Sequence, residues 1–308
     1  MTKGLPDPTF WKDRRVLLTG HTGFKGAWLA LWLAEMGARV TGLSLAPSTQ
    51  PNLFDLASVS ARVQSHIGDI RDANLVREIA NKVAPRVIIH MAAQALVRRS
   101  YREPADTFAS NVMGTVNVLD AARATNGLDA CLIITSDKVY ENDGTGTAFK
   151  ENARLGGHDP YSASKAATEI AVASYREAFF GDQKAKPATA RGGNVIGGGD
   201  FSEDRIVPDI WRAHEANQAV VLRYPDATRP WQHVLDCLCG YLVYAEHLAK
   251  GEFEPAMNFG PREKKGLAVR ELVSAMQGAI GAREAWIQAA APQPKEMPAL
   301  ALSCEKAE

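Results

Sequence analysis

A glycine-rich turn near the start of the chain constrains its fold more than any other feature. The run RVLLTGHTGFKGAWLALWLAEMGA places Gly20, Gly23 and Gly26 between an apolar, strand-like segment and a helical one. Glycines at such a turn permit a tight bend, let backbone N–H groups approach a pyrophosphate and let the helix pack closely on a sheet. The spacing is G-x-x-G-x-x-G, one residue longer at its start than the usual fingerprint. Because strand, turn and helix occur together, we predict a dinucleotide site here.

Strand-like and helix-like segments alternate through the first half of the chain. RVTGLSL, RVIIHMAA and ACLIITS are short and apolar, whereas DANLVREIANKVAP, TFASNVMGTVNVLDAARATNG and YSASKAATEIAVASYREAFF have helical patterns. Such alternation predicts βαβ units and a parallel sheet. We therefore expect an α/β fold of the Rossmann type, with a doubly wound parallel sheet.

The alternation loosens after the glycine-rich run GGNVIGGGDF, residues 192–201. We predict a nucleotide-binding domain over 1–192 and a smaller, mainly substrate-binding lobe over 193–308, with roughly 230–260 returning to the first domain. Trp211 and Trp231 are expected in the core or on a pocket wall. Ser303 is placed like a helix N-cap, but too few residues follow it for a stable helix, so we expect the natural chain to continue past Glu308.

Composition narrows the class of function. Lys and Arg together number 35, as do Asp and Glu, so the net charge is zero, which argues against a nucleic-acid-binding protein with a basic surface. The start of the chain lacks the apolar core of a signal peptide, and no run of about 18 apolar residues could span a membrane. The four cysteines show neither metal-ligand nor disulfide spacing. We expect a soluble cytoplasmic protein without a metal and without nucleic-acid or membrane partners.

The second strand-like segment bears on the identity of the nucleotide. ARVTGLSLAPS does not end in the Asp or Glu that would bind an adenosine ribose, and Ser44 is the nearest polar substitute. No Arg follows at once to pair with a 2′-phosphate, so NAD is favoured over NADP. Asp69, in HIGDIRD, could accept a hydrogen bond from an adenine amino group; alternatively, it caps the helix that starts near Asp72.

A tyrosine and a lysine share one face of a predicted helix. In DPYSASKAATE, Tyr161 and Lys165 are one helical turn apart. A neighbouring ammonium lowers the pKa of a phenol, as would a positively charged nicotinamide ring. Such a tyrosine can remove a proton from a substrate hydroxyl while hydride leaves the same carbon. A bare YxxxK is more often a surface pair, but the cofactor turn upstream favours catalysis here.

The strand-like segment CLIITSDKVYEN ends in an acid beside a base, Asp137 and Lys138. One interpretation is an ordinary solvated ion pair at a strand exit. The other is a catalytic acid and base at the carboxyl end of a strand, where open α/β sheets bind their ligands.

Four motifs together resemble the extended short-chain dehydrogenase/reductase family over nearly the whole chain. They are TGHTGFKG (19–26), HMAAQ (90–94), NVMGTVNVLDAAR (111–123) and YSASK (161–165). Within that family, TFWKDRRVLLTGHTGFKGAWLALWLAEMGA and RPWQHVLD (229–236) look like the nucleotide-sugar 4,6-dehydratases that act on CDP-glucose. The resemblance implies an NAD-dependent hydro-lyase of deoxysugar biosynthesis, such as that of lipopolysaccharide O-antigen.

The resemblance also implies roles for individual residues. Thr135 would hydrogen-bond the sugar 4-hydroxyl, Asp137 would protonate the departing 6-hydroxyl, and Lys138 would remove the C5 proton. Lys138 falls where dTDP-glucose and GDP-mannose relatives have Glu. CDP-glucose enzymes resemble this chain in having Lys there, and so do the inverting UDP-N-acetylglucosamine 4,6-dehydratases. The cofactor-binding set implied is Gly20, Thr22, Gly23, Phe24, Gly26, Ser44, Asp69, Ile70, Ala92, Ala93, Asn111, Tyr161 and Lys165.

The resemblance places the nucleotide sugar against Asn194, Arg205 and Arg229. Arginine suits a diphosphate because its guanidinium fork binds two oxygens at once. His233 is either a diphosphate donor or a structural histidine. We also expect at least a homodimer, formed by the helical segments near 104–125 and 161–179. The alternatives are another nucleotide-sugar dehydratase, an epimerase, which would not need Asp137 and Lys138, or a non-enzymatic NAD-binding regulator.

Overall fold

The computed structural model describes residues 4–181, 183–262, 266–282, 286–290 and 297–308. Its centre is a seven-stranded sheet in the order β11-β6-β5-β4-β1-β2-β3, with every neighbouring pair parallel. The chain winds outward from β1 in one direction and then in the other, which confirms the predicted doubly wound Rossmann sheet. The strands are β1 (Arg15–Thr19), β2 (Arg39–Ser44), β3 (Gln64–Ile67), β4 (Val87–His90), β5 (Ala130–Ile134), β6 (Pro187–Gly192) and β11 (Ala256–Phe259).

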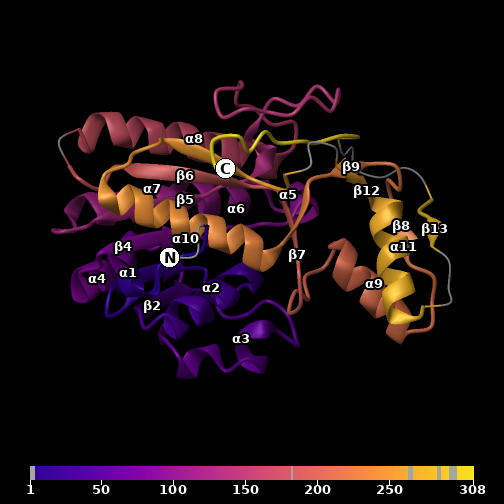
Figure 1. Cartoon of the computed structure of the whole chain (residues 1–308), viewed down its shortest axis with the longest axis horizontal. Helices are drawn as coiled ribbons and strands as arrows, with labels where there is room; N and C mark the ends of the chain where they lie inside the picture. The colour runs from indigo at the N-terminus through magenta and orange to yellow at the C-terminus, as the bar shows by residue number, and fades with distance from the viewer. Residues whose placement is uncertain (1–3, 182, 263–265, 283–285, 291–296) are drawn as a thin grey trace.

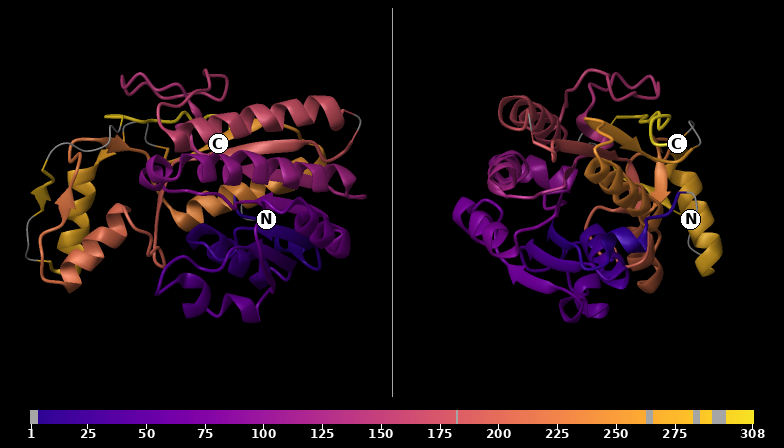
Figure 2. Two further views of the ribbon diagram at one scale, coloured as in Figure 1. Left: turned by 180° about the vertical axis from the view of Figure 1, so that it is seen from behind. Right: turned by 60° about the vertical axis from the view of Figure 1, so that its left-hand side comes forward.

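Helices cover both faces of this sheet, as the two views of Figure 2 show. Successive side chains of β1 go to opposite faces, so that Val16 and Leu18 pack in one core and Leu17 in the other. Because both faces are buried, the central strands are apolar throughout rather than alternating. One face carries α1 (Pro8–Trp11), α2 (Phe24–Glu35) and α10 (Val234–Lys250); the other carries α4 (Ala73–Val83), α7 (Gly114–Ala124) and α8 (Pro160–Phe179).

The helical run predicted near 104–125 is interrupted. It consists of α6 (Pro104–Phe108), a π-helical turn over Ala109–Met113, and α7. Gly114 follows the turn and touches Ile70, where a Cβ would collide with the isoleucine side chain. Such π-turns are frequent at functional sites because they redirect side chains. The remaining short elements here are α3 (Leu53–Leu56), α5 (Val97–Arg102) and the 3₁₀ turns η1 (Val59–Ala61) and η3 (Asp137–Val139).

A smaller lobe stands beyond the carboxyl ends of the strands, at the right of Figure 1. Its own core contains Ile210, Val220, Leu222 and Val273. Trp211 is 45% exposed, so its prediction as core or pocket wall was wrong, whereas Trp231 lines the pocket. The lobe and its connections contain β7 (Asn194–Ile196), α9 (Ile206–Glu215), β8 (Val221–Leu222), β9 (Thr228–Arg229), β10 (Trp231–His233), β12 (Leu267–Ala268), α11 (Val269–Ile280) and β13 (Ile287–Gln288).

The chain returns from this lobe to the sheet through α10 and β11. Near the end, Leu302 pairs with Phe149 and residues 305–307 form a turn instead of a helix. Among the helices of the described ranges, none has the length and apolarity needed to cross a bilayer.

Candidate active site

One cavity of about 650 Å³ contains almost all of the predicted site residues. It extends from the glycine turn, past the carboxyl ends of the central strands, to the smaller lobe, where doubly wound sheets bind ligands. Its wall includes Gly20, Thr22, Gly23, Phe24, Gly26, Ser44, Asp69, Ile70, Ala92, Ala93, Thr135, Asp137, Lys138, Tyr161, Lys165, Asn194, Arg205 and Arg229. In the described part of the chain no group of three or more metal-ligating side chains occurs.

The glycine turn has the shape that a pyrophosphate requires. Gly20 has φ +80°, and a Cβ there would lie 2.7 Å from the Ala92 nitrogen. A Cβ on Gly26 would collide with the Gly20 carbonyl oxygen. Gly23 is the N-cap of α2 and makes no side-chain cap, which leaves the N–H groups of the first helical turn available to an anion. These residues therefore fit an NAD pyrophosphate.

Hydroxyl groups replace the usual acid at the adenosine end of the cavity. Ser44 and Thr22 are hydrogen-bonded to each other, with 2.8 Å between their hydroxyl oxygens. Asp69 pairs with Arg71, whose guanidinium lowers the pKa of that carboxyl. The cap of α4 is Asp72, which accepts from two backbone N–H groups, so the capping alternative for Asp69 was wrong.

At the end of β5, two neighbouring hydroxyls have different surroundings. The Thr135 hydroxyl donates to Glu169 Oε1 at 2.5 Å, inside a buried network that also contains Arg191. Ser136 instead forms a side-chain hydrogen bond with Tyr161. The hydroxyl that interacts with the candidate base therefore belongs to Ser136. Thr135 also lines the cavity, and its assignment to the sugar 4-hydroxyl stays a prediction.

Asp137 is 1% exposed, and only one of its two carboxyl oxygens has hydrogen-bond partners among the described residues. Its Oδ1 accepts from Ser136 Oγ at 2.9 Å and lies 3.4 Å from Lys138 Nζ. Its Oδ2 is buried and has no hydrogen-bond partner among the described residues. Lys138 Nζ also lies 3.5 Å from Asn194 Oδ1. Acid and base are thus adjacent on the cavity wall, which differs from an ordinary solvated pair.

Tyr161 and Lys165 are both buried on one face of α8. Lys165 Nζ donates to the Ile134 carbonyl at 3.1 Å. Burial, aided by the positive charge of Lys25, lowers the pKa of Lys165 to about 8, while Glu169 acts in the opposite direction. Burial raises the pKa of Tyr161, although the Ser136 hydrogen bond and the Arg205 charge oppose that rise. The pKa of Tyr161 is therefore raised in this structure, so the predicted lowering was wrong for the chain without ligands.

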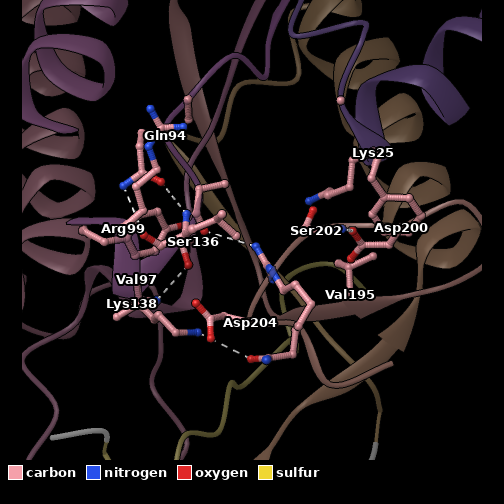
Figure 3. Close-up of a pocket in the computed structure, with 18 of the residues that line it drawn as sticks. Lys25, Gln94, Val97, Arg99, Ser136, Lys138, Val195, Asp200, Ser202 and Asp204 are labelled. Atoms are coloured by element: carbon pink, nitrogen blue, oxygen red, sulfur yellow. Dashed lines mark hydrogen bonds between the residues drawn. The ribbon is translucent and has the colours of Figure 1, made fainter. Parts of the chain in front are cut away.

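Arginines gather at the end of the cavity nearest the smaller lobe. Asp204 accepts from Arg98 at 3.0 Å and from Arg223 at 2.8 Å, and Figure 3 shows Asp204 between the two sides of the pocket. Arg205 donates to the Ala95 carbonyl at 3.1 Å, and Arg229 is buried. Arg98 and Arg223 were missed in the sequence, although LVRRS begins only two positions after the end of HMAAQ. Together these side chains could hold a diphosphate.

Two predicted site residues lie off the cavity wall. Asn111 is buried; its side chain accepts from the Gln94 N–H and donates to the Gln94 carbonyl and to Ser164 Oγ. It therefore positions the Gln94 loop and does not touch the cofactor space. His233 is the exposed N-cap of α10, with Nδ1 accepting from the Leu235 N–H, so the structural interpretation of this histidine holds.

The sequence profile of the NAD-dependent epimerase/dehydratase family matches residues 16–260. The chain belongs to this family. The predicted membership in the extended short-chain dehydrogenase/reductase group and the predicted NAD cofactor are thereby confirmed.

Among curated proteins, a CDP-glucose 4,6-dehydratase from Salmonella typhimurium is 43% identical over 308 residues, which cover 98% of this chain and 86% of the relative. A dTDP-glucose 4,6-dehydratase from Xanthomonas campestris is 30% identical over 84% of this chain and 75% of the relative. Among solved structures, a Thermus thermophilus UDP-glucose 4-epimerase in complex with NAD has a TM-score of 0.82 and 25% identity, covering 95% of this chain and 91% of its own.

Proposed function

We propose that the chain is a CDP-glucose 4,6-dehydratase. It converts CDP-D-glucose to CDP-4-keto-6-deoxy-D-glucose and water, and the NADH formed in the first step is oxidised back to NAD+ at the end of each cycle. The observation that carries the proposal is the Asp137–Lys138 pair at the end of β5, facing the same cavity as Tyr161. Sequence identity of 43% over 98% of the chain to a CDP-glucose 4,6-dehydratase supports it.

The first chemical step uses the base on α8. Bound NAD+ supplies the hydride acceptor for C4 and returns the hydride to C6. Tyr161 removes the proton of the sugar 4-hydroxyl, with the Ser136 hydroxyl hydrogen-bonded to its phenol oxygen. The Lys165 charge favours the phenolate as it forms. The 4-ketone that results acidifies the neighbouring C5–H bond.

The elimination uses the neighbours at the end of β5. Lys138 takes the C5 proton, and Asp137 gives a proton to the departing 6-hydroxyl, which leaves as water. The buried Oδ2 of Asp137, which has no hydrogen-bond partner among the described residues, is the oxygen from which that proton is given. The return of hydride to C6 is balanced by a proton that Lys138 gives back to C5. Lys138 is 26% exposed on its side chain, so solvent can exchange its proton between cycles.

The nucleotide specificity is tested by offering the CDP, dTDP, UDP and GDP sugars in turn with NAD+ and measuring the loss of water by mass spectrometry. We expect turnover of CDP-glucose above the others. Preferred turnover of UDP-N-acetylglucosamine would favour the inverting dehydratases, which share the lysine. Inversion of the configuration at C4 without loss of water would favour an epimerase. Absence of any reaction would favour a non-enzymatic NAD-binding regulator.

The assembly we propose is a homodimer or larger homo-oligomer in the cytoplasm, with NAD preferred over NADP. Of the apolar residues expected at the interface, Leu119 and Val172 are buried in the sheet's own core, whereas Met113 is 53% and Ile170 61% exposed. These exposed side chains support helix pairing with a second copy. The product would enter deoxysugar biosynthesis, such as that of lipopolysaccharide O-antigen. The division into 1–192 and 193–308 remains a prediction.

A further inference from the structure

A second lysine–tyrosine pair lies beside the catalytic pair. Lys25 is the second residue of α2, within the glycine turn, and its side chain lines the cavity. The buried residues that follow it on α2 are small or apolar. A cation at the first turn of such a helix has no role in packing against the sheet, so its position calls for an electrostatic reason.

The partner of Lys25 comes from the far end of the chain. Lys25 Nζ donates to the Tyr241 hydroxyl at 3.0 Å and lies 4.8 Å from the centre of its ring. Tyr241 is fully buried on α10. A Cβ on Gly192, at the end of β6, would collide with the Tyr241 hydroxyl and lie 3.5 Å from Lys25 Nζ. The glycine therefore leaves the space in which the two side chains meet.

This second pair is electrostatically connected to the first. The charge of Lys25 contributes to lowering the pKa of Lys165. Tyr241 in turn interacts with the charges of Asp137 and Tyr161. Figure 3 shows Lys25 on the side of the pocket opposite Ser136 and Lys138. Lys25 thus extends from the pyrophosphate turn into the cavity, where its charge acts on Lys165.

We infer that Lys25, held by Tyr241, is a positioning residue that tunes the redox step by placing positive charge beside the nicotinamide end of the cofactor space. The dinucleotide must run from the glycine turn to Tyr161, since hydride leaves the carbon whose hydroxyl Tyr161 deprotonates. When that hydride and its two electrons arrive, the nicotinamide ring changes from +1 to neutral, while the proton goes to Tyr161. A nearby cation therefore destabilises the oxidised ring relative to the reduced one and favours oxidation at C4.

The test is the ratio of the dissociation constants of NAD+ and NADH, measured by calorimetry on the full chain without any sugar. A unit charge on the order of 10 Å away, at an effective dielectric constant of about 20, corresponds to roughly a tenfold change in that ratio. We expect Lys25→Met and Lys25→Gln to strengthen NAD+ binding relative to NADH by about tenfold. Lys25→Arg keeps the charge and should keep the wild-type ratio.

Two controls separate charge from structure. Lys82→Met, on the exposed last turn of α4, should leave the ratio unchanged. Tyr241→Phe keeps the ammonium and should change the ratio less than Lys25→Met. An unchanged ratio in both neutral Lys25 variants, or equal weakening of NAD+ and NADH, would overturn the inference. The inference rests on the proposed function only where it links the charge of Lys25 to oxidation at C4. The ratio of the NAD+ and NADH dissociation constants does not depend on which nucleotide sugar is the substrate.

Discussion

Replacing each of two adjacent hydroxyls should separate catalysis from stability. Ser136 is hydrogen-bonded to Tyr161, whereas Thr135 donates to the buried Glu169. Ser136→Ala removes a hydroxyl beside the reacting 4-oxygen, and losing one such positioned donor reduces kcat by roughly 10²–10³. The variant also loses the buried hydrogen bond from Ser136 Oγ to Asp137 Oδ1, so its Tm should fall as well, and kcat is the quantity that separates the two variants.

Thr135→Val should lower Tm while leaving kcat almost unchanged. It removes a 2.5 Å hydrogen bond to a carboxylate that also accepts from Thr189 and Arg191. A hydrogen bond to a charged group contributes about 1.5–3 kcal/mol to stability. With about 2.1 cal/mol/K of unfolding entropy per residue over 308 residues, that loss lowers Tm by about 2–5 °C. The value of kcat should change only a few-fold.

The assay combines single-turnover NADH formation from CDP-glucose with thermal unfolding of each variant. Wild type and Thr189→Val, which removes a different donor to Glu169, serve as references. If Thr135→Val lost activity as strongly as Ser136→Ala while keeping its Tm, then Thr135 would be the hydroxyl that binds the sugar. The argument for Ser136 from its hydrogen bond with Tyr161 would then be refuted.

Further predictions follow from the same geometry. Lys138→Met should allow NADH to form but prevent C5 from taking up solvent deuterium, with a loss of about 10²–10⁴ in rate; normal exchange would remove Lys138 from the mechanism. Calorimetry should show tighter binding of NAD+ than of NADP+, and the reverse order would contradict the role of Ser44. Burial lowers the pKa of Lys165 from 10.5 to about 8, so the unfolded chain binds more protons between these values and stability rises with pH there. Lys165→Met should reduce the rise in the free energy of unfolding with pH, measured by urea unfolding, by up to about 3 kcal/mol. An unchanged dependence on pH would show that Lys165 does not titrate in this range. Sedimentation at micromolar concentration should show at least a dimer, and a monomer alone would refute the interface around Met113 and Ile170.

The sheet was predictable because its cause is local. The glycine turn and the alternation of strand-like and helix-like segments determine βαβ winding, and the winding rule then sets the order of the strands. The π-turn over Ala109–Met113 was not predictable from periodicity, and neither was the close approach of Gly114, which follows it, to Ile70 from another segment. That turn also decides that Asn111 faces the Gln94 loop rather than the cofactor space.

The choice between Thr135 and Ser136 shows a second limit. Both side chains line the cavity and both are almost fully buried, so neither their burial nor their place on the wall distinguishes them. Both residues follow the last residue of β5, Ile134, and both have a hydroxyl. Only the position of Glu169 on α8, which accepts from Thr135, separates them. His233 was undecided for a similar reason, because its role depends on where α10 begins.

Lys25 shows what sequence could have indicated and what it could not. The turn requires glycines at Gly20, Gly23 and Gly26 for close backbone approach, and the helix after it requires apolar residues for packing, so a lysine between them is anomalous on physical grounds alone. Its partner Tyr241 lies 216 positions further along the chain, and the two meet only because α10 returns from the smaller lobe to pack beside α2. The contact between Lys25 and Tyr241 therefore depends on the return of α10 to the sheet. The position of the Lys25 charge near Lys165 follows from this topology rather than from any local motif.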